Sequence, residues 1–180
     1  MKNLFKKILI LVNILTLCQC AALAQIDKIK FDKQTYNLSN PDSETKNYDY
    51  LLKDENIGNW HTKLQLSNFP NLTNPTDASA QYAHEIQEKT KGASVLLYPD
   101  AAIVGFLTFP ENKEYYEYNT AIYKPAKTKG LDRFSYAKRF YSSELGGQEE
   151  ARKKAIEFAE KNNKKYMELV TKEAPKYKVD

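Results

Sequence analysis

Two neighbouring stretches of the sequence concentrate side chains that can recognise another molecule. Residues 114–123 are rich in tyrosine, and residues 131–141 contain Arg133 and Arg139, two of the three arginines in the chain. Tyrosine and arginine anchor many binding surfaces because each combines a large contact area with a polar tip. Both stretches have the character of strands, so the chemistry they offer is recognition of a protein or of an anionic group.

The side chains of a strand point alternately to its two faces, which decides which of these residues can act together. Arg133 and Arg139 are six residues apart and therefore share a face, with only small residues between them on that face. An antiparallel neighbour can bring the odd-numbered residues of 114–123 alongside. The predicted binding residues are Tyr115, Glu117, Asn119, Arg133, Arg139 and Tyr141. The alternative is structural: Glu117 neutralises one arginine, and a helix half covers the tyrosines.

Residues able to catalyse a reaction or to bind a metal are sparse and scattered. The two histidines, His61 and His84, fall in a predicted strand and a predicted helix, and neither has a second histidine or a cysteine at metal-ligand spacing. The sequence also lacks phosphate-binding glycine loops and serine-nucleophile motifs. We predict no catalytic residue, no metal site and no cofactor. The enzyme alternative is a hydrolase in which His61 or His84 meets a carboxylate in a cleft.

The first 24 residues have the pattern of a secretory signal peptide. Three lysines form a positive start, Ile8–Cys18 is mostly apolar, and Ala22 and Ala24 are small residues at the positions that a signal peptidase recognises. The apolar run is shorter than the roughly 20 residues that a transmembrane helix needs. We predict cleavage after Ala24, export to the periplasm of a Gram-negative bacterium, and no stable membrane insertion afterwards.

Cleavage at this position removes both cysteines, Cys18 and Cys20, and leaves an almost neutral chain. The whole chain has 27 basic and 23 acidic residues, and the signal segment holds three of the lysines and no acidic residue, which leaves 24 against 23, or +1. So small a charge argues against a nucleic-acid partner. The alternative processing is lipidation of a cysteine, but Leu17 and Gln19 stand where lipidation requires a small residue.

The remaining residues predict a polar lead-in over 25–45, with one short strand around 35–38, and then a single α+β domain over 46–180. Helices are expected at 77–91 and, with one apolar stripe, from 148 to about Pro175. Strands are expected at 47–53, 60–69, 94–98, 101–109, 114–123 and 131–141. The last four are joined by short turns, which predicts an antiparallel meander with 101–109 as a central strand buried on both faces. The expected fold is an antiparallel sheet of five to six strands in an α/β/α sandwich.

This element order resembles that of the PsbP/Mog1-like superfamily: a strand led by Trp60, a helix, a four-strand meander and a long C-terminal helix. The segments 59–62 and 130–141 are also similar to small, uncharacterised secreted bacterial proteins. The resemblance covers most of residues 46–172. It implies the sandwich fold and a role in binding or organising other proteins, and it transfers no functional residue, because a fold does not determine a function.

Together these observations predict an exported, non-enzymatic binding or accessory protein that recognises a protein or a small ligand. Two alternatives remain open. One is the hydrolase described above, acting on material of the cell envelope, and the other is an immunity-like inhibitor of a secreted toxin.

Overall fold

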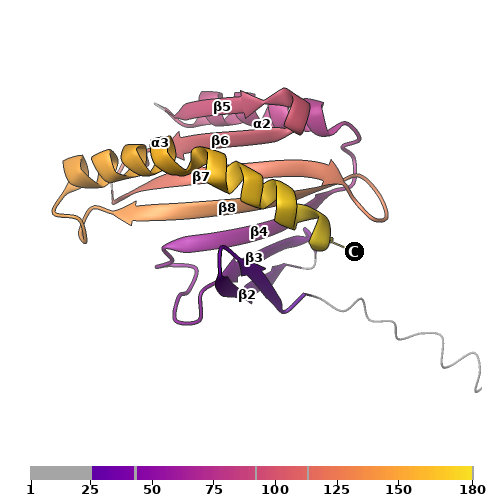
Figure 1. Ribbon diagram of the computed structural model, residues 1–180, viewed down its shortest axis with the longest axis horizontal. Helices are drawn as coiled ribbons and strands as arrows, with labels where there is room; N and C mark the ends of the chain where they lie inside the picture. Colours follow the sequence, from indigo (N-terminus) through magenta and orange to yellow (C-terminus); the bar gives the residue numbers. More distant parts are fainter. Residues whose placement is uncertain (1–25, 43, 92, 113, 180) are drawn as a thin grey trace, which may run out of the picture.

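In the part of the chain that the structure describes, eight antiparallel strands form one sheet in the order β1-β2-β3-β4-β8-β7-β6-β5, flanked by two helices (Figure 1). This is a computed structural model, and it describes residues 26–42, 44–91, 93–112 and 114–179. The predicted signal peptide over 1–24 lies outside the described residues. The strands are β1 (Lys28–Phe31), β2 (Gln34–Asp42), β3 (Asn47–Leu51), β4 (Thr62–Phe69), β5 (Ser94–Tyr98), β6 (Ile103–Thr108), β7 (Tyr115–Pro125) and β8 (Leu131–Tyr141).

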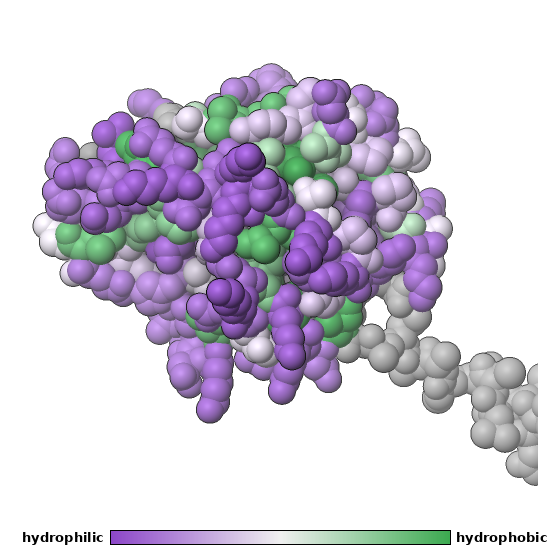
Figure 2. Space-filling model, viewed as in Figure 1, coloured by the Kyte–Doolittle hydropathy of each residue, from purple (hydrophilic) through white to green (hydrophobic). Residues whose placement is uncertain are grey.

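Helix α2 (Pro75–Lys89) follows β4, and the long helix α3 (Gln148–Glu173) follows β8, so the predicted α+β class is confirmed. Short 3-10 turns lie at η1 (Pro99–Ala101) and η2 (Ala174–Lys176). None of the described helices is both long and apolar enough to cross a membrane. The outward side of α3 is mostly hydrophilic (Figure 2), in keeping with a lysine-rich solvated face.

The prediction of five to six strands was too low, because much of the expected lead-in folds as β1 and β2. Ile29 and Phe31 alternate with lysines in β1, and their side chains are 0% and 1% exposed. Asp32 and Lys33 have φ angles of 45° and 65°, the left-handed pair that a two-residue hairpin turn requires. The alternating pattern of β1 is only four residues long, which is too short to stand out in the sequence. Strand β2 consists largely of polar residues, so the sequence predicted only a short part of it as a strand.

Strands β5 to β8 form the predicted meander, and β4 pairs with β8 to continue the sheet. Strand β6 is buried on both faces as expected, but the prediction that it is central was wrong, since only β5 lies beyond it. Its burial comes from helices on both sides rather than from a central place in the sheet. Val104 and Phe106 contact the residues under α2, whereas Ile103 and Leu107 face α3.

The predicted helix 77–91 begins and ends two residues earlier than expected. Asn74, rather than Asp77, is the N-cap: its Oδ1 accepts hydrogen bonds from the backbone N–H groups of Thr76 and Asp77, at 2.9 and 3.4 Å. Pro75 occupies the first helical turn, where its fixed φ is favourable and its missing N–H is not needed.

An aromatic core under α3 joins the two ends of the described chain. The Tyr136 and Tyr166 rings stack at 4.4 Å, and Phe31 of β1 packs against Tyr136 at 5.3 Å. Asp32 accepts hydrogen bonds from the Tyr166 hydroxyl at 2.9 Å and from Lys165 Nζ at 2.7 Å. The first hairpin is therefore fastened to the last helix.

Candidate functional site

The face of the sheet that carries α2 is only partly covered. Helix α2 lies against β5, β6 and β7, so part of β7 and the adjoining β8 and β4 have no helix above them on this face. The cross-strand register places Glu117 opposite Arg139 and Asn119 opposite Ala137. All six predicted binding residues lie on this face, because strands β7 and β8 pair antiparallel and the six have odd numbers.

A hollow of about 290 Å³, here called the polar trough, runs along this face beside α2. Its lining includes Lys63, Gln65, Glu117, Asn119 and Ser135 from the sheet, with Tyr82 and Ile86 from α2. The floor is polar because β4, β7 and β8 each direct one row of alternate residues into it. Lys63 and Gln65 were not predicted, since nothing local in the sequence pairs β4 with β8.

Arg139 lies next to the polar trough and is held in place by Glu117, which lines it. Its Nε donates a hydrogen bond of 2.8 Å to Glu117 Oε2, and the two side chains are 16% and 17% exposed. The guanidinium lies between the rings of Trp60 and Tyr115, at 3.8 and 4.0 Å from their centroids. Burial lowers the pKa of Arg139, but the hydrogen bonds to Glu117 and Tyr141 and the charge of Glu117 together outweigh it, so the pKa lies above its usual value. Arg139 therefore fits the structural alternative raised by the sequence, in which Glu117 neutralises one of the arginines.

Arg133 lines a neighbouring hollow rather than the polar trough, and it is held less completely. One terminal nitrogen, Nη2, donates to Gln65 Oε1 at 2.9 Å, and Gln65 Nε2 donates in turn to Asp49 Oδ1 at 3.0 Å. The guanidinium lies 4.7 Å from the Tyr82 ring centroid and 5.1 Å from that of Phe69. Its Nε is buried and has no hydrogen-bond partner among the described residues.

Unpartnered donors therefore remain in and beside the polar trough. Asn119 Nδ2 is buried without a partner in the described part of the chain, as is Arg133 Nε. A buried donor without an acceptor destabilises the folded protein by about 1–3 kcal/mol. A ligand that supplies an acceptor here removes that cost, which favours its binding. Three cations, Lys63, Arg133 and Arg139, are balanced by three carboxylates: Asp49, Glu117 and Glu85, which lines a neighbouring hollow together with Arg133.

The two tyrosines of the predicted set support other residues. Tyr115 stacks on Arg139, and the Tyr141 hydroxyl donates a 3.0 Å hydrogen bond to the carbonyl of Trp60. Trp60 is 1% exposed and lies two residues before the start of β4, so this bond fixes the loop that carries it. Sequence reasoning did not predict a role for Trp60 beyond beginning the strand.

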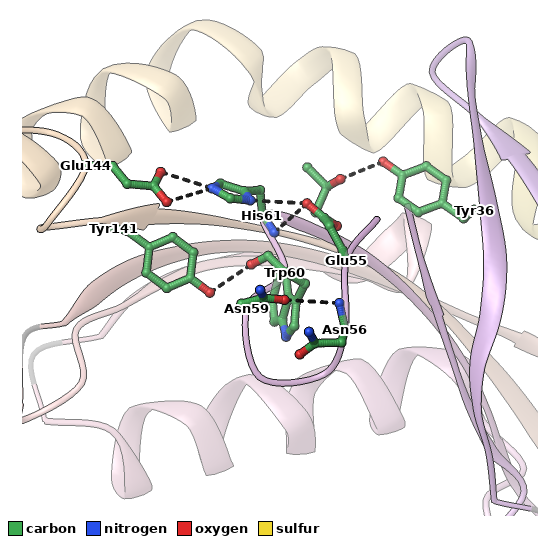
Figure 3. A network of polar contacts seen from close by, with 9 residues as sticks. Tyr36, Glu55, Asn56, Asn59, Trp60, His61, Tyr141 and Glu144 are labelled. Atoms are coloured by element: carbon green, nitrogen blue, oxygen red, sulfur yellow. Dashed lines mark hydrogen bonds and ion pairs between the residues drawn. The ribbon is translucent and has the colours of Figure 1, made fainter. Parts of the chain in front are cut away.

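His61 lies on the other side of the sheet, toward α3, in a network that Figure 3 shows from close by. Its Nδ1 is 3.2 Å from Glu55 Oε1, and its Nε2 is 3.0 Å from Glu144 Oε2. Both ring nitrogens of His61 thus face carboxylates. The hydroxyl of the neighbouring Thr62 does not contact the histidine but accepts a hydrogen bond from the Tyr36 hydroxyl. The network links the loop before β4 to the loop after β8.

Both histidines meet carboxylates, as the hydrolase alternative expects, but neither lines the polar trough. His61 is 46% exposed and does not line the polar trough. His84 is an exposed residue of α2 that pairs with Glu88 at 3.2 Å, one helical turn away. In the described part of the chain, no group of three or more histidine, cysteine, aspartate or glutamate residues is placed to hold a metal ion.

The chain also matches a protein family. A family model matches residues 23–174, which is most of the chain. The chain belongs to this uncharacterised family. The match gives no evidence for the PsbP/Mog1-like resemblance, which rests on element order alone. No curated protein and no solved structure matches the chain.

Proposed function

We propose that this protein is an exported, non-enzymatic binding or accessory protein, and that it holds its ligand or partner in the polar trough. The observation that carries the proposal is the pair of buried, unpartnered donors, Asn119 Nδ2 and Arg133 Nε. Native proteins rarely leave such groups unsatisfied, and exceptions point to strain, to function or to a bound molecule. Export rests on the signal-peptide pattern of residues 1–24.

The polar side chains in and beside the trough are ordered before anything binds. Glu117 holds Arg139, and the chain of hydrogen bonds from Asp49 through Gln65 fixes one side of Arg133. Side chains already held in place lose little conformational entropy on binding, which favours affinity and specificity.

The chemistry of the trough favours a ligand that presents oxygen acceptors, such as a carboxylate or an amide carbonyl. Both free groups are donors, which pair with oxygen acceptors. A volume of 290 Å³ is at the lower end for ligand sites, so the bound group is small. A free small molecule and a peptide segment of a partner both provide such a group.

The proposal is tested by capture from cell-envelope extract with tagged protein, followed by mass spectrometry of both bound proteins and bound small molecules. Asn119→Asp keeps the size of the side chain, replaces the free donor by an acceptor and adds a negative charge. We expect it to lower capture at least tenfold, since a charged group is left facing the ligand's oxygens.

The matched control is Asn162→Asp, since Asn162 is a half-buried asparagine of α3 on the other face, where it donates to the Phe158 carbonyl. This control should capture the same molecules at full strength. Equal capture by wild type and Asn119→Asp, with both melting at the same temperature, would contradict the assignment of the trough.

A further inference from the structure

A larger cavity, of about 510 Å³, lies on the face that carries α3 and is separate from the polar trough. We call it the apolar groove; it runs between α3 and strands β5 and β6, and its lining includes Leu96, Leu107, Phe109, Arg152, Ile156 and Ala159. Leu96 is 52% exposed because α3 crosses the sheet without covering β5 on this side. Figure 2 shows apolar surface in the upper part of this view, where Figure 1 places β5 and β6 above α3.

Small residues keep the groove open. Gly105 of β6 lines it without a side chain, and a Cβ there would lie 3.0 Å from Asn163 Oδ1. Ala159 of α3 is the second small residue in the lining. Asn163 is already saturated: its Oδ1 accepts from Tyr118 at 3.0 Å, and its Nδ2 donates to the Tyr98 hydroxyl at 3.2 Å. This end of the groove is therefore closed by polar groups that need no ligand.

Residues of opposite charge line different parts of the groove. Arg152 and Glu160 both line it and are eight residues apart on α3, which is about 12 Å along the helix axis. Arg152 has no ion-pair partner among the described residues, and its nearest ring is Phe109, at 5.9 Å from the centroid. A negative group is therefore attracted to the Arg152 end and repelled from the Glu160 end.

We propose that the apolar groove binds a medium-chain acyl carboxylate, with the carboxylate at Arg152 and the acyl chain along Leu107 and Ile156. The stretch from Phe109 to Gly105 covers four residues of extended chain, about 13 Å, and a linear apolar chain fits such a length better than a compact ring system. Cavities of this volume, mostly apolar with a few placed polar groups, are typical of small-molecule sites. The inference does not depend on the proposed role of the polar trough.

The experiment is a calorimetric titration of the purified protein with sodium octanoate, with 1-octanol and butyrate as comparison ligands. Octanoate should bind, while 1-octanol, which has the same chain length and no charge, should bind at least tenfold more weakly. Butyrate should bind more weakly as well, because it leaves most of the apolar lining uncovered.

Four variants assign the binding to the groove. Arg152→Gln should weaken octanoate binding about tenfold, the lower end for losing a hydrogen bond to a charged group. Lys153→Gln, at the next and equally exposed position, should leave it unchanged. Ala159→Leu should abolish it by filling the cavity, with circular dichroism confirming that the fold is intact. Asn119→Asp in the trough should have no effect.

The proposal is wrong if octanoate gives no binding heat with the wild type, or if 1-octanol binds as tightly. It is equally wrong if Arg152→Gln and Lys153→Gln weaken octanoate to the same extent, or if the folded Ala159→Leu protein binds as the wild type does. Success or failure here leaves the capture experiment on the trough unaffected, because the two sites lie on opposite faces of the sheet.

Discussion

Replacing Arg139 by alanine should destabilise the protein far more than removing a surface charge. Two kinds of contact are lost: the 2.8 Å hydrogen bond to Glu117, and the stacking between the rings of Trp60 and Tyr115. A hydrogen bond between charged groups contributes about 1.5–3 kcal/mol, and a partly buried cation over a ring adds about 0.5–1 kcal/mol. Because these contributions are not additive, we expect a loss of about 2–4 kcal/mol in the free energy of unfolding.

The assay is urea unfolding followed by tryptophan fluorescence. The chain has one tryptophan, Trp60, and it lies directly against Arg139. The matched control is Arg152→Ala, since Arg152 is exposed and makes no ion pair with any described residue. A surface substitution of this kind changes stability by about 0.5 kcal/mol or less. Glu117→Gln, alone and combined with Arg139→Ala, gives the coupling energy, which should be about 1 kcal/mol or more.

A loss below about 1 kcal/mol for Arg139→Ala would refute this reasoning, because exposed ion pairs contribute about 0–1 kcal/mol. The same result would return Arg139 to the group of residues free to bind a ligand.

Three further predictions concern other parts of the fold. Burial raises the pKa of Tyr36 from 10.0 to about 12, so above pH 10 the folded state keeps a proton that the unfolded state releases. The contribution of Tyr36 to stability should therefore be full below pH 10 and fall by about 3 kcal/mol as the pH rises to 12. Urea midpoints that stay constant from pH 9 to 11 would contradict this. Burial lowers the pKa of Lys124 to about 8, so stability should rise between pH 8 and 10, and Lys124→Met should remove that rise in the same titration. Gly130 and Gly146 both have φ of +81°, but a Cβ at Gly130 would lie 2.1 Å from the Phe69 carbonyl oxygen, whereas one at Gly146 meets nothing within 4 Å. Gly146→Ala should therefore cost about 1–2 kcal/mol in thermal melts and Gly130→Ala clearly more, and similar losses would argue against the close approach at Gly130.

The parts of the fold that local pattern specifies were predictable. The meander β5–β8 has short connections, so each strand had one obvious partner, and alternation placed Glu117 and Arg139 on the same face. The pairing of β4 with β8 joins residues about 70 positions apart, and no local pattern indicates it. Lys63 and Gln65, which complete the polar trough, were missed for that reason.

Two other features depend on tertiary structure and were likewise beyond the sequence. The position of α2 on the sheet decides which part of that face stays uncovered. The sequence of the helix indicates only that one of its sides is apolar. The apolar groove exists because α3 does not reach β5, although Gly105 in an otherwise apolar strand was a signal that a neighbour approaches closely.

The fastening of the first hairpin to the last helix has a consequence for how the chain folds. Phe31 and Asp32 find their partners, Tyr136 and Tyr166, only after more than a hundred further residues have been made. Contacts between such distant positions raise the contact order and slow folding, since loop closure must precede the gain from packing. A chain still emerging from a ribosome or a translocation channel therefore exposes its aromatic core until α3 has arrived. We expect folding to complete only after the whole chain is released, with a chaperone-dependent interval before it does.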